Sequence, residues 1–195
     1  IPHLQARDLL KRVFTETAED LENLVKILKD EGIIVQRPEI KFDPSKEYAL
    51  GEFNISFTNH PLQPRDILGF YGNKIIEAYL KDRTRYFEHW SSYNILKEYA
   101  MNGANWVSMP KPVLDKDWQT TYEEYYKRGA ILFHNANLIK CGKDIFHSQS
   151  NQKDSVNGKG TEHGLEWYKK QLPEFTFNEV PIGGHVDGKI AIIKP

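Results

Sequence analysis

Residues 66–79 read DILGFYGNKIIEAY, and this stretch decides the fold class of the chain. Two apolar runs flank the pair Gly72-Asn73, which predicts a β-hairpin because both residues can adopt a positive φ in a two-residue turn. The spacing that follows predicts a helix ended by Gly103, and then a further strand. The predicted ββαβ unit has strands at residues 66–71 and 74–79, a helix at residues 86–102 and a strand at residues 106–109.

The same order of elements returns further along the chain. Gly142, in the turn Gly142-Lys143, follows Gly72 by 70 positions, and Gly103 follows the earlier helix-stop residue Gly32 by 71 positions. Such a period predicts an internal repeat whose modules bury one another's faces. The second set of elements comprises strands at residues 131–133, 138–141 and 144–146, a helix at residues 164–172 and a strand at residues 175–180.

The two ends of the chain predict incomplete modules. A helix at residues 17–31 precedes a short buried strand at residues 33–35, residues 39–63 form a loop with one edge strand, and residues 189–193 begin another strand. Unpaired strand edges attract other chains, so we expect a fragment that joins the remaining modules, or a homo-oligomer. We predict one α/β domain divided into a partial module at residues 1–63, modules at 64–112 and 113–182, and the start of another at 183–195.

Composition excludes several classes of protein. The chain has 26 Lys and Arg against 27 Asp and Glu, so its net charge of −1 offers no electrostatic footprint for nucleic acid. No apolar run approaches the roughly 20 residues of a membrane span, and the first residues carry charge where a signal peptide is apolar. We therefore expect a cytoplasmic protein that binds neither nucleic acid nor membrane.

Histidine and cysteine give weak signals. The seven His residues are scattered and none shows the HExxH spacing of a zinc site, so we expect no metal and rank a metal hydrolase a distant third among the hypotheses. Cys141 is the only Cys, and such residues before a turn glycine are most often small buried hydrophobes.

Residues 183–188 read GGHVDG and form the most informative polar string. In an extended segment His185 and Asp187 point to the same side, where a general acid/base and an anion can serve one substrate. The alternative is a solvated turn with polar residues. Asp66 is another carboxylate at the start of a predicted strand, although Asp in that place is more often a turn former.

Several motifs, in order, resemble the amidinotransferases, the group that contains the glycine and inosamine amidinotransferases. The resemblance covers nearly the whole chain and implies the pentein fold, a propeller of five ββαβ modules. It rests on VQRP at residues 35–38, PRDIL at 64–68, GNKIIEA at 72–78, RYFE at 85–88, PKP at 110–112, NANLIKCGKDIF at 135–146, GLEW at 164–167 and HVD at 185–187.

The resemblance implies transfer of an amidino group from arginine to an amine acceptor, without a cofactor. A planar, permanently charged guanidinium must be gripped by carboxylates and attacked by a thiolate. By their positions in the motifs, Asp66 and Asp187 correspond to carboxylates that bind the guanidino group. His185 corresponds to the general acid/base.

Three departures from the family pattern bear on activity. The carboxylate that orients the catalytic His belongs to a family string FDAAD or FDAAN, but residues 133–137 read FHNAN and place His134 there. If the family fold is kept, His134 faces the same cleft as His185. The family's nucleophilic Cys has no counterpart, since Cys141 aligns with a small apolar position, and residues 182–184 differ from the string that shapes acceptor choice.

We therefore predict an amidinotransferase-like protein that is inactive as this chain alone. The alternative is a non-catalytic guanidino-binding or assembly module that uses Asp66 and Asp187 without chemistry.

Overall fold

The computed structural model describes residues 2–40, 43, 46–50, 53–55, 62–80, 82–111, 129–148, 160–182 and 184–193. The chain divides into two compact units, residues 1–37 and residues 38–195. The predicted boundary between modules at residues 112–113 lies outside the described residues, and so does the predicted turn residue Gly183.

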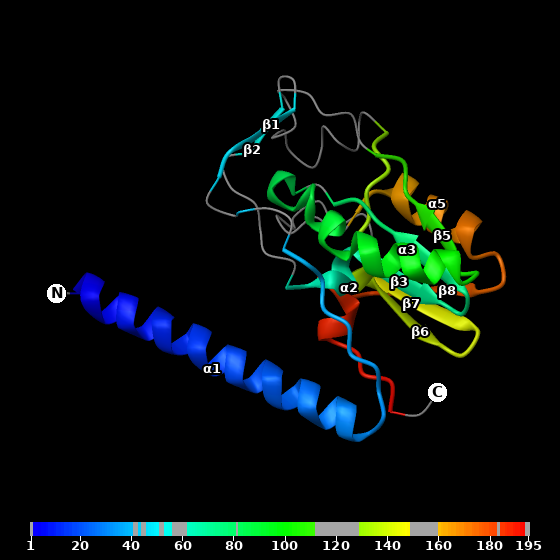
Figure 1. The fold of residues 1–195 in the computed structure, drawn as a ribbon. Helices are drawn as coiled ribbons and strands as arrows, with labels where there is room; N and C mark the ends of the chain where they lie inside the picture. The colour runs from blue at the N-terminus through cyan, green and yellow to red at the C-terminus, as the bar shows by residue number, and fades with distance from the viewer. Residues whose placement is uncertain are drawn as a thin grey trace. The chain divides into compact units, whose positions relative to one another are not determined.

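The first unit is the long helix α1 (Pro2–Asp30) and the segment after it (Figure 1). Gly32 adopts φ 77°, and its N–H and that of Ile33 donate to the carbonyls of Lys29 and Leu28 at 2.9 Å each. This is the Schellman arrangement that ends many helices, so the predicted stop is confirmed. The predicted buried strand at residues 33–35 is wrong: these residues form no strand, and they are half-buried or exposed.

The second unit begins with a small antiparallel pair. β1 (Tyr48–Leu50) pairs with β2 (Phe53–Ile55), where the sequence predicted one edge strand. The Ile55 side chain is buried in the larger core cluster of this unit.

The next elements form a ββαβ module. β3 and β4 pair antiparallel with Phe70 opposite Ile75, and β5 returns parallel to β4 after α3. In the hairpin only Gly72 has a positive φ (61°), so Asn73 does not share that role. The elements are α2 (Pro64–Ile67), β3 (Leu68–Tyr71), β4 (Lys74–Glu77), η1 (Arg83–Arg85), η2 (Glu88–Ser92), α3 (Tyr93–Met101) and β5 (Asn105–Ser108).

A second module repeats this topology (Figure 1). β6 and β7 form an antiparallel hairpin in which Gly142 has φ 60°, and β8 lies parallel to β7 after α5. The predicted repeat of ββαβ modules in an α/β fold is therefore confirmed. Its elements are η3 (Asn135–Asn137), β6 (Leu138–Cys141), β7 (Asp144–Ser148), α5 (Glu162–Gln171), β8 (Thr176–Val180) and, after them, η4 (Val186–Gly188).

Tertiary packing overrides the sequence prediction at four places. Asp66 lies in the helical turn α2, begun by Pro64, and not in a strand. The helix predicted at residues 86–102 is divided into η2 and α3, residues 131–133 contribute only a bridge from Phe133 to Gly160, and residues 189–193 form no strand. The two strand errors, at residues 131–133 and 189–193, concern segments whose pairing partners would be remote in the sequence or are not among the described residues.

Both modules share one apolar core. It joins Ile76 of β4 and Ile145 of β7, each 0% exposed, with Phe133 and with Tyr168 of α5. A smaller cluster around Leu96 packs α3 onto its own sheet. No described helix is long and apolar enough to cross a membrane.

Candidate functional site

Three short helical turns meet beside the two sheets. α2 contacts η3, and η3 and β6 both contact η4. Val186 is 0% exposed and anchors η4, while the N–H groups of Lys189 and Ile190 donate to its carbonyl. The four residues predicted as a site lie on these turns or directly before them: Asp66, His134, His185 and Asp187.

The two histidine rings lie side by side. Their centroids are 5.0 Å apart with an angle of 40° between the ring planes. His134 directly precedes η3 and is buried, whereas His185 directly precedes η4 and is half-buried.

Asp187 lies in η4, so the extended segment that was predicted to point it to the same side as His185 is wrong. Its Oδ2 instead accepts a hydrogen bond of 2.7 Å from Nε of Arg65, a residue of α2. Nη2 of Arg65 donates to the carbonyl of Leu138 at 2.9 Å. The carboxylate is therefore already engaged by a guanidinium of the chain itself.

Asp66 also binds an internal guanidinium. Its Oδ2 accepts from Nη1 of Arg85 at 2.5 Å, and Arg85 donates to both carboxylate oxygens of Glu88, at 2.5 and 2.9 Å. Burial disfavours the Arg85 cation, yet the hydrogen bonds to Glu88 and Asp66 outweigh it and raise its pKa. Burial raises the pKa of Glu88, although Arg85 opposes this. Asp66 thus belongs to a buried ionic triad.

Asn135 holds the turns together, a role that was not predicted from the sequence. Its side-chain N–H₂ donates to the carbonyls of Arg65 and Leu68, at 3.1 and 3.0 Å, and its Oδ1 accepts from the Tyr71 hydroxyl at 2.9 Å. The Tyr168 hydroxyl of the second module donates to the same oxygen at 3.4 Å. The departure from Ala in the family string was the available signal. A buried amide that bridges two modules fixes α2 against η3.

A second buried polar cluster lies on β4. Glu77 accepts from the Tyr79 hydroxyl at 3.0 Å and from the Trp106 indole at 3.1 Å, and His89 Nε2 lies 3.4 Å from the same carboxylate. Burial raises the pKa of Glu77 and, with Lys111, lowers the pKa of His89 to about 3. The distance is that of an ion pair, but the burial of both groups keeps His89 neutral at pH 7.

Cys141 is the last residue of β6, whereas His134 precedes η3, before the first residue of that strand. Cys141 forms the hairpin end of the strand, opposite Asp144, three residues and therefore about 10 Å beyond Leu138. It is half-buried. Within the described residues no three His, Cys, Asp or Glu side chains gather closely enough to hold a metal ion.

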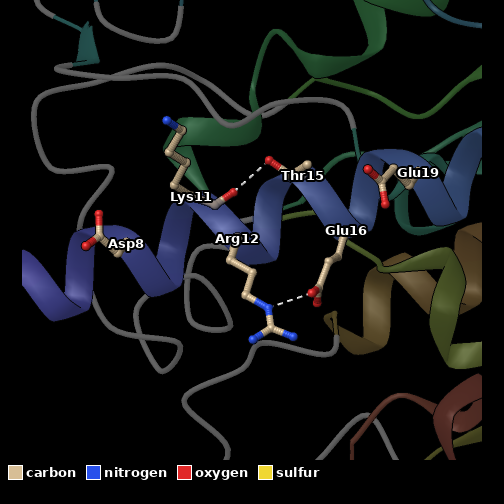
Figure 2. Close-up of a pocket in the computed structure, with 6 residues that line it drawn as sticks. All are labelled: Asp8, Lys11, Arg12, Thr15, Glu16 and Glu19. Carbon is tan, nitrogen blue, oxygen red and sulfur yellow. Dashed lines mark hydrogen bonds and ion pairs between the residues drawn. The ribbon is translucent and has the colours of Figure 1, made fainter.

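A shallow hollow lies on the first unit, entirely along α1 (Figure 2). Within it Arg12 and Glu16 form an ion pair of 2.6 Å, and the Thr15 hydroxyl donates to the carbonyl of Lys11. One exposed helix face offers no enclosed ligand position. The hollow contains none of the four predicted site residues.

Known amidinotransferases resemble this chain in sequence and in structure. Glycine amidinotransferase, mitochondrial, from Xenopus laevis is 33% identical over 198 residues, which cover 91% of this chain and 45% of that protein. L-arginine:L-lysine amidinotransferase from Pseudomonas savastanoi pv. phaseolicola is 31% identical, with 91% of this chain and 51% of that protein covered. The chain spans about half the length of these relatives.

The solved structure of inosamine-phosphate amidinotransferase from Streptomyces griseus superposes with a TM-score of 0.73 at 28% identity, covering 95% of this chain and 53% of that one. No protein-family profile matches the chain. The resemblance predicted from the motifs is confirmed over nine-tenths of the sequence and in the arrangement of the modules. The chain is similar to the amidinotransferases over nine-tenths of its length and has their pentein-type fold.

Proposed function

We propose that the chain supplies a guanidino-binding and proton-transfer region for moving an amidino group from an arginine-like donor to an amine acceptor. The observation that carries this proposal is the engagement of Asp187 by a guanidinium, beside the paired rings of His134 and His185. A carboxylate that already accepts a guanidinium N–H has the chemistry needed for the donor substrate. The names of the relatives favour amidino transfer over a non-catalytic binding module.

The proposed roles follow from this placement. Asp187 accepts N–H groups of the donor guanidinium, and Asp66 contributes a second carboxylate whose charge is shared with Arg85. In the complete reaction a thiolate other than Cys141 attacks the guanidinium carbon, and the C–N bond to the departing amine breaks as His185 gives that amine a proton. The acceptor amine then displaces the sulfur and returns a proton to His185.

His134 changes this chemistry. It stands where the family string has a carboxylate, so no anion there stabilises the imidazolium of His185 during proton transfer. The only thiol of these 195 residues, Cys141, is separated from the ring pair by most of β6. We therefore propose that these residues alone bind a guanidino donor without turning it over.

Binding is tested by titrating arginine into the chain and following the His185 ring by NMR. We expect saturable shifts that Asp187→Asn abolishes. Asp30→Asn is the matched control because it alters a carboxylate in an exposed ion pair with Lys26 on α1. Shifts that persist unchanged in Asp187→Asn would refute the proposed site.

Turnover is tested with arginine and either glycine or hydroxylamine, by measuring ornithine release. We expect no release above buffer. Release that disappears in Cys141→Ser would show that Cys141 is the nucleophile and would overturn the proposed inactivity.

We propose that the chain pairs with another copy or with the remaining modules of a propeller, which light scattering tests, and that it is cytoplasmic, which cell fractionation tests. We also propose modules at residues 64–112 and 113–182. Limited proteolysis tests this boundary, and we expect the first cleavage to fall near it.

A further inference from the structure

Arg65 is far more exposed than Arg85, which carries the other guanidinium near the predicted site. The side chain of Arg85 is 9% exposed and binds two buried carboxylates, so it is locked in place. The side chain of Arg65 is 52% exposed, and its partner Asp187 is 26% exposed. Arg65 can therefore leave its carboxylate for water, whereas Arg85 cannot do so without leaving buried charges unpaired.

The backbone of Arg65 is nevertheless fixed. Its carbonyl accepts from Asn135, and α2 is held against η3. The side chain makes two directed contacts, from Nε to Asp187 and from Nη2 to the carbonyl of Leu138. A side chain whose backbone is fixed and whose guanidinium is half-exposed can occupy a binding position and leave it reversibly.

An external guanidinium and Arg65 are chemically the same group. Both are planar cations that donate N–H groups, and both seek the carboxylate of Asp187. Two such cations within a few ångströms repel each other, so a ligand that binds Asp187 must displace the resident side chain.

We propose that Arg65 is a built-in competitor, which holds Asp187 when the site is empty and is exchanged for the guanidinium of the ligand. This inference rests on the proposed function, in which Asp187 is the carboxylate that receives the donor. Arg65 thereby lowers the affinity for guanidino ligands and neutralises the Asp187 carboxylate while the site is empty.

The test uses agmatine, which has a guanidinium but no carboxylate that a displaced Arg65 could bind. Because a partly exposed ion pair shifts an equilibrium by about two- to fivefold, Arg65→Gln should tighten agmatine binding by about that factor. Arg65→Lys should give a smaller change, since its ammonium still competes for Asp187 although it cannot reproduce both contacts of Arg65. Arg12→Gln, which removes a guanidinium from an exposed pair on α1, should change nothing.

A direct readout accompanies the affinities. In the unsubstituted chain agmatine should release the Nε–H of Arg65, which ¹⁵N NMR detects as faster exchange with water. If agmatine binds but Arg65→Gln binds it equally or more weakly, the exchange is refuted while the proposed site stands. If agmatine does not bind, or binds unchanged in Asp187→Asn, the proposed function fails and the inference fails with it.

Discussion

Removing the Arg85 guanidinium should cost more stability than any surface change in this chain. Arg85→Met keeps much of the apolar stem but deletes every hydrogen bond to the carboxylates of Asp66 and Glu88. The Glu88 side chain is 0% exposed and that of Asp66 is 10% exposed. Neither carboxylate can recover its lost partner from bulk water without local opening of the fold.

The expected loss follows from this burial. Breaking a buried ion pair by removing one partner costs about 3–5 kcal/mol, because the remaining charge is left uncompensated. With a urea dependence of about 2 kcal/mol per molar, the unfolding midpoint should fall by about 2 M. That is a large part of the stability of about 5–15 kcal/mol that is usual for a domain.

The pH dependence of the stability of Arg85→Met provides an independent test. Burial already raises the pKa of Glu88 above 4.5, and removing Arg85 removes the main opposing influence. The folded variant then holds this proton more tightly than the unfolded chain does, so its stability falls as the pH rises through the raised pKa. The deficit of Arg85→Met should therefore be smaller at pH 5 than at pH 7.

The assay is urea unfolding followed by the fluorescence of the four Trp residues at both pH values. Arg12→Met is the matched control, because the Arg12–Glu16 pair is 75% and 55% exposed and should contribute nothing measurable. A midpoint for Arg85→Met within about 0.5 M of the parent at pH 7, or a deficit that grows on acidification, would refute the reasoning about the triad.

Three further predictions concern packing and protonation. Gly164→Ala should lower the free energy of unfolding by about 1–3 kcal/mol despite the helix preference of Ala, because the new Cβ would overlap the carbonyl of Leu132, whereas Gly188→Ala meets open space and should be neutral in the same urea assay. Burial and Lys111 lower the pKa of His89 to about 3, so only the unfolded chain takes up this proton between about pH 6.5 and 3. Stability is therefore lost as the pH falls through that window, and His89→Gln should flatten this loss in unfolding midpoints measured at pH 7 and 4.5; an unchanged slope would contradict it. Asn135→Ala should cost about 2–4 kcal/mol in a thermal melt because several buried polar groups lose their partner, and a melting temperature equal to that of the parent would show that water replaces the amide.

Local signals determined the modules. Gly72 and Gly142 each take the positive φ of a hairpin turn, and Gly32 and Gly103 each end a helix with a positive φ. Hairpin turns and helix stops depend on conformational limits of single residues, so they can be predicted without knowledge of distant contacts. The repeat and the α/β class follow from such local patterns. The family resemblance follows from short motifs in the sequence itself.

Only the tertiary structure decided the partners within the predicted site. The sequence placed Asp66 and Asp187 near a substrate guanidinium, but not Arg65 against Asp187, which is 122 residues away in the chain. It also could not predict that Asp66 would be paired with Arg85. The partners of ion pairs and of buried amides such as Asn135 depend on which surfaces pack together, because the interaction energy depends on burial and distance. Such pairs follow no periodic pattern in the sequence.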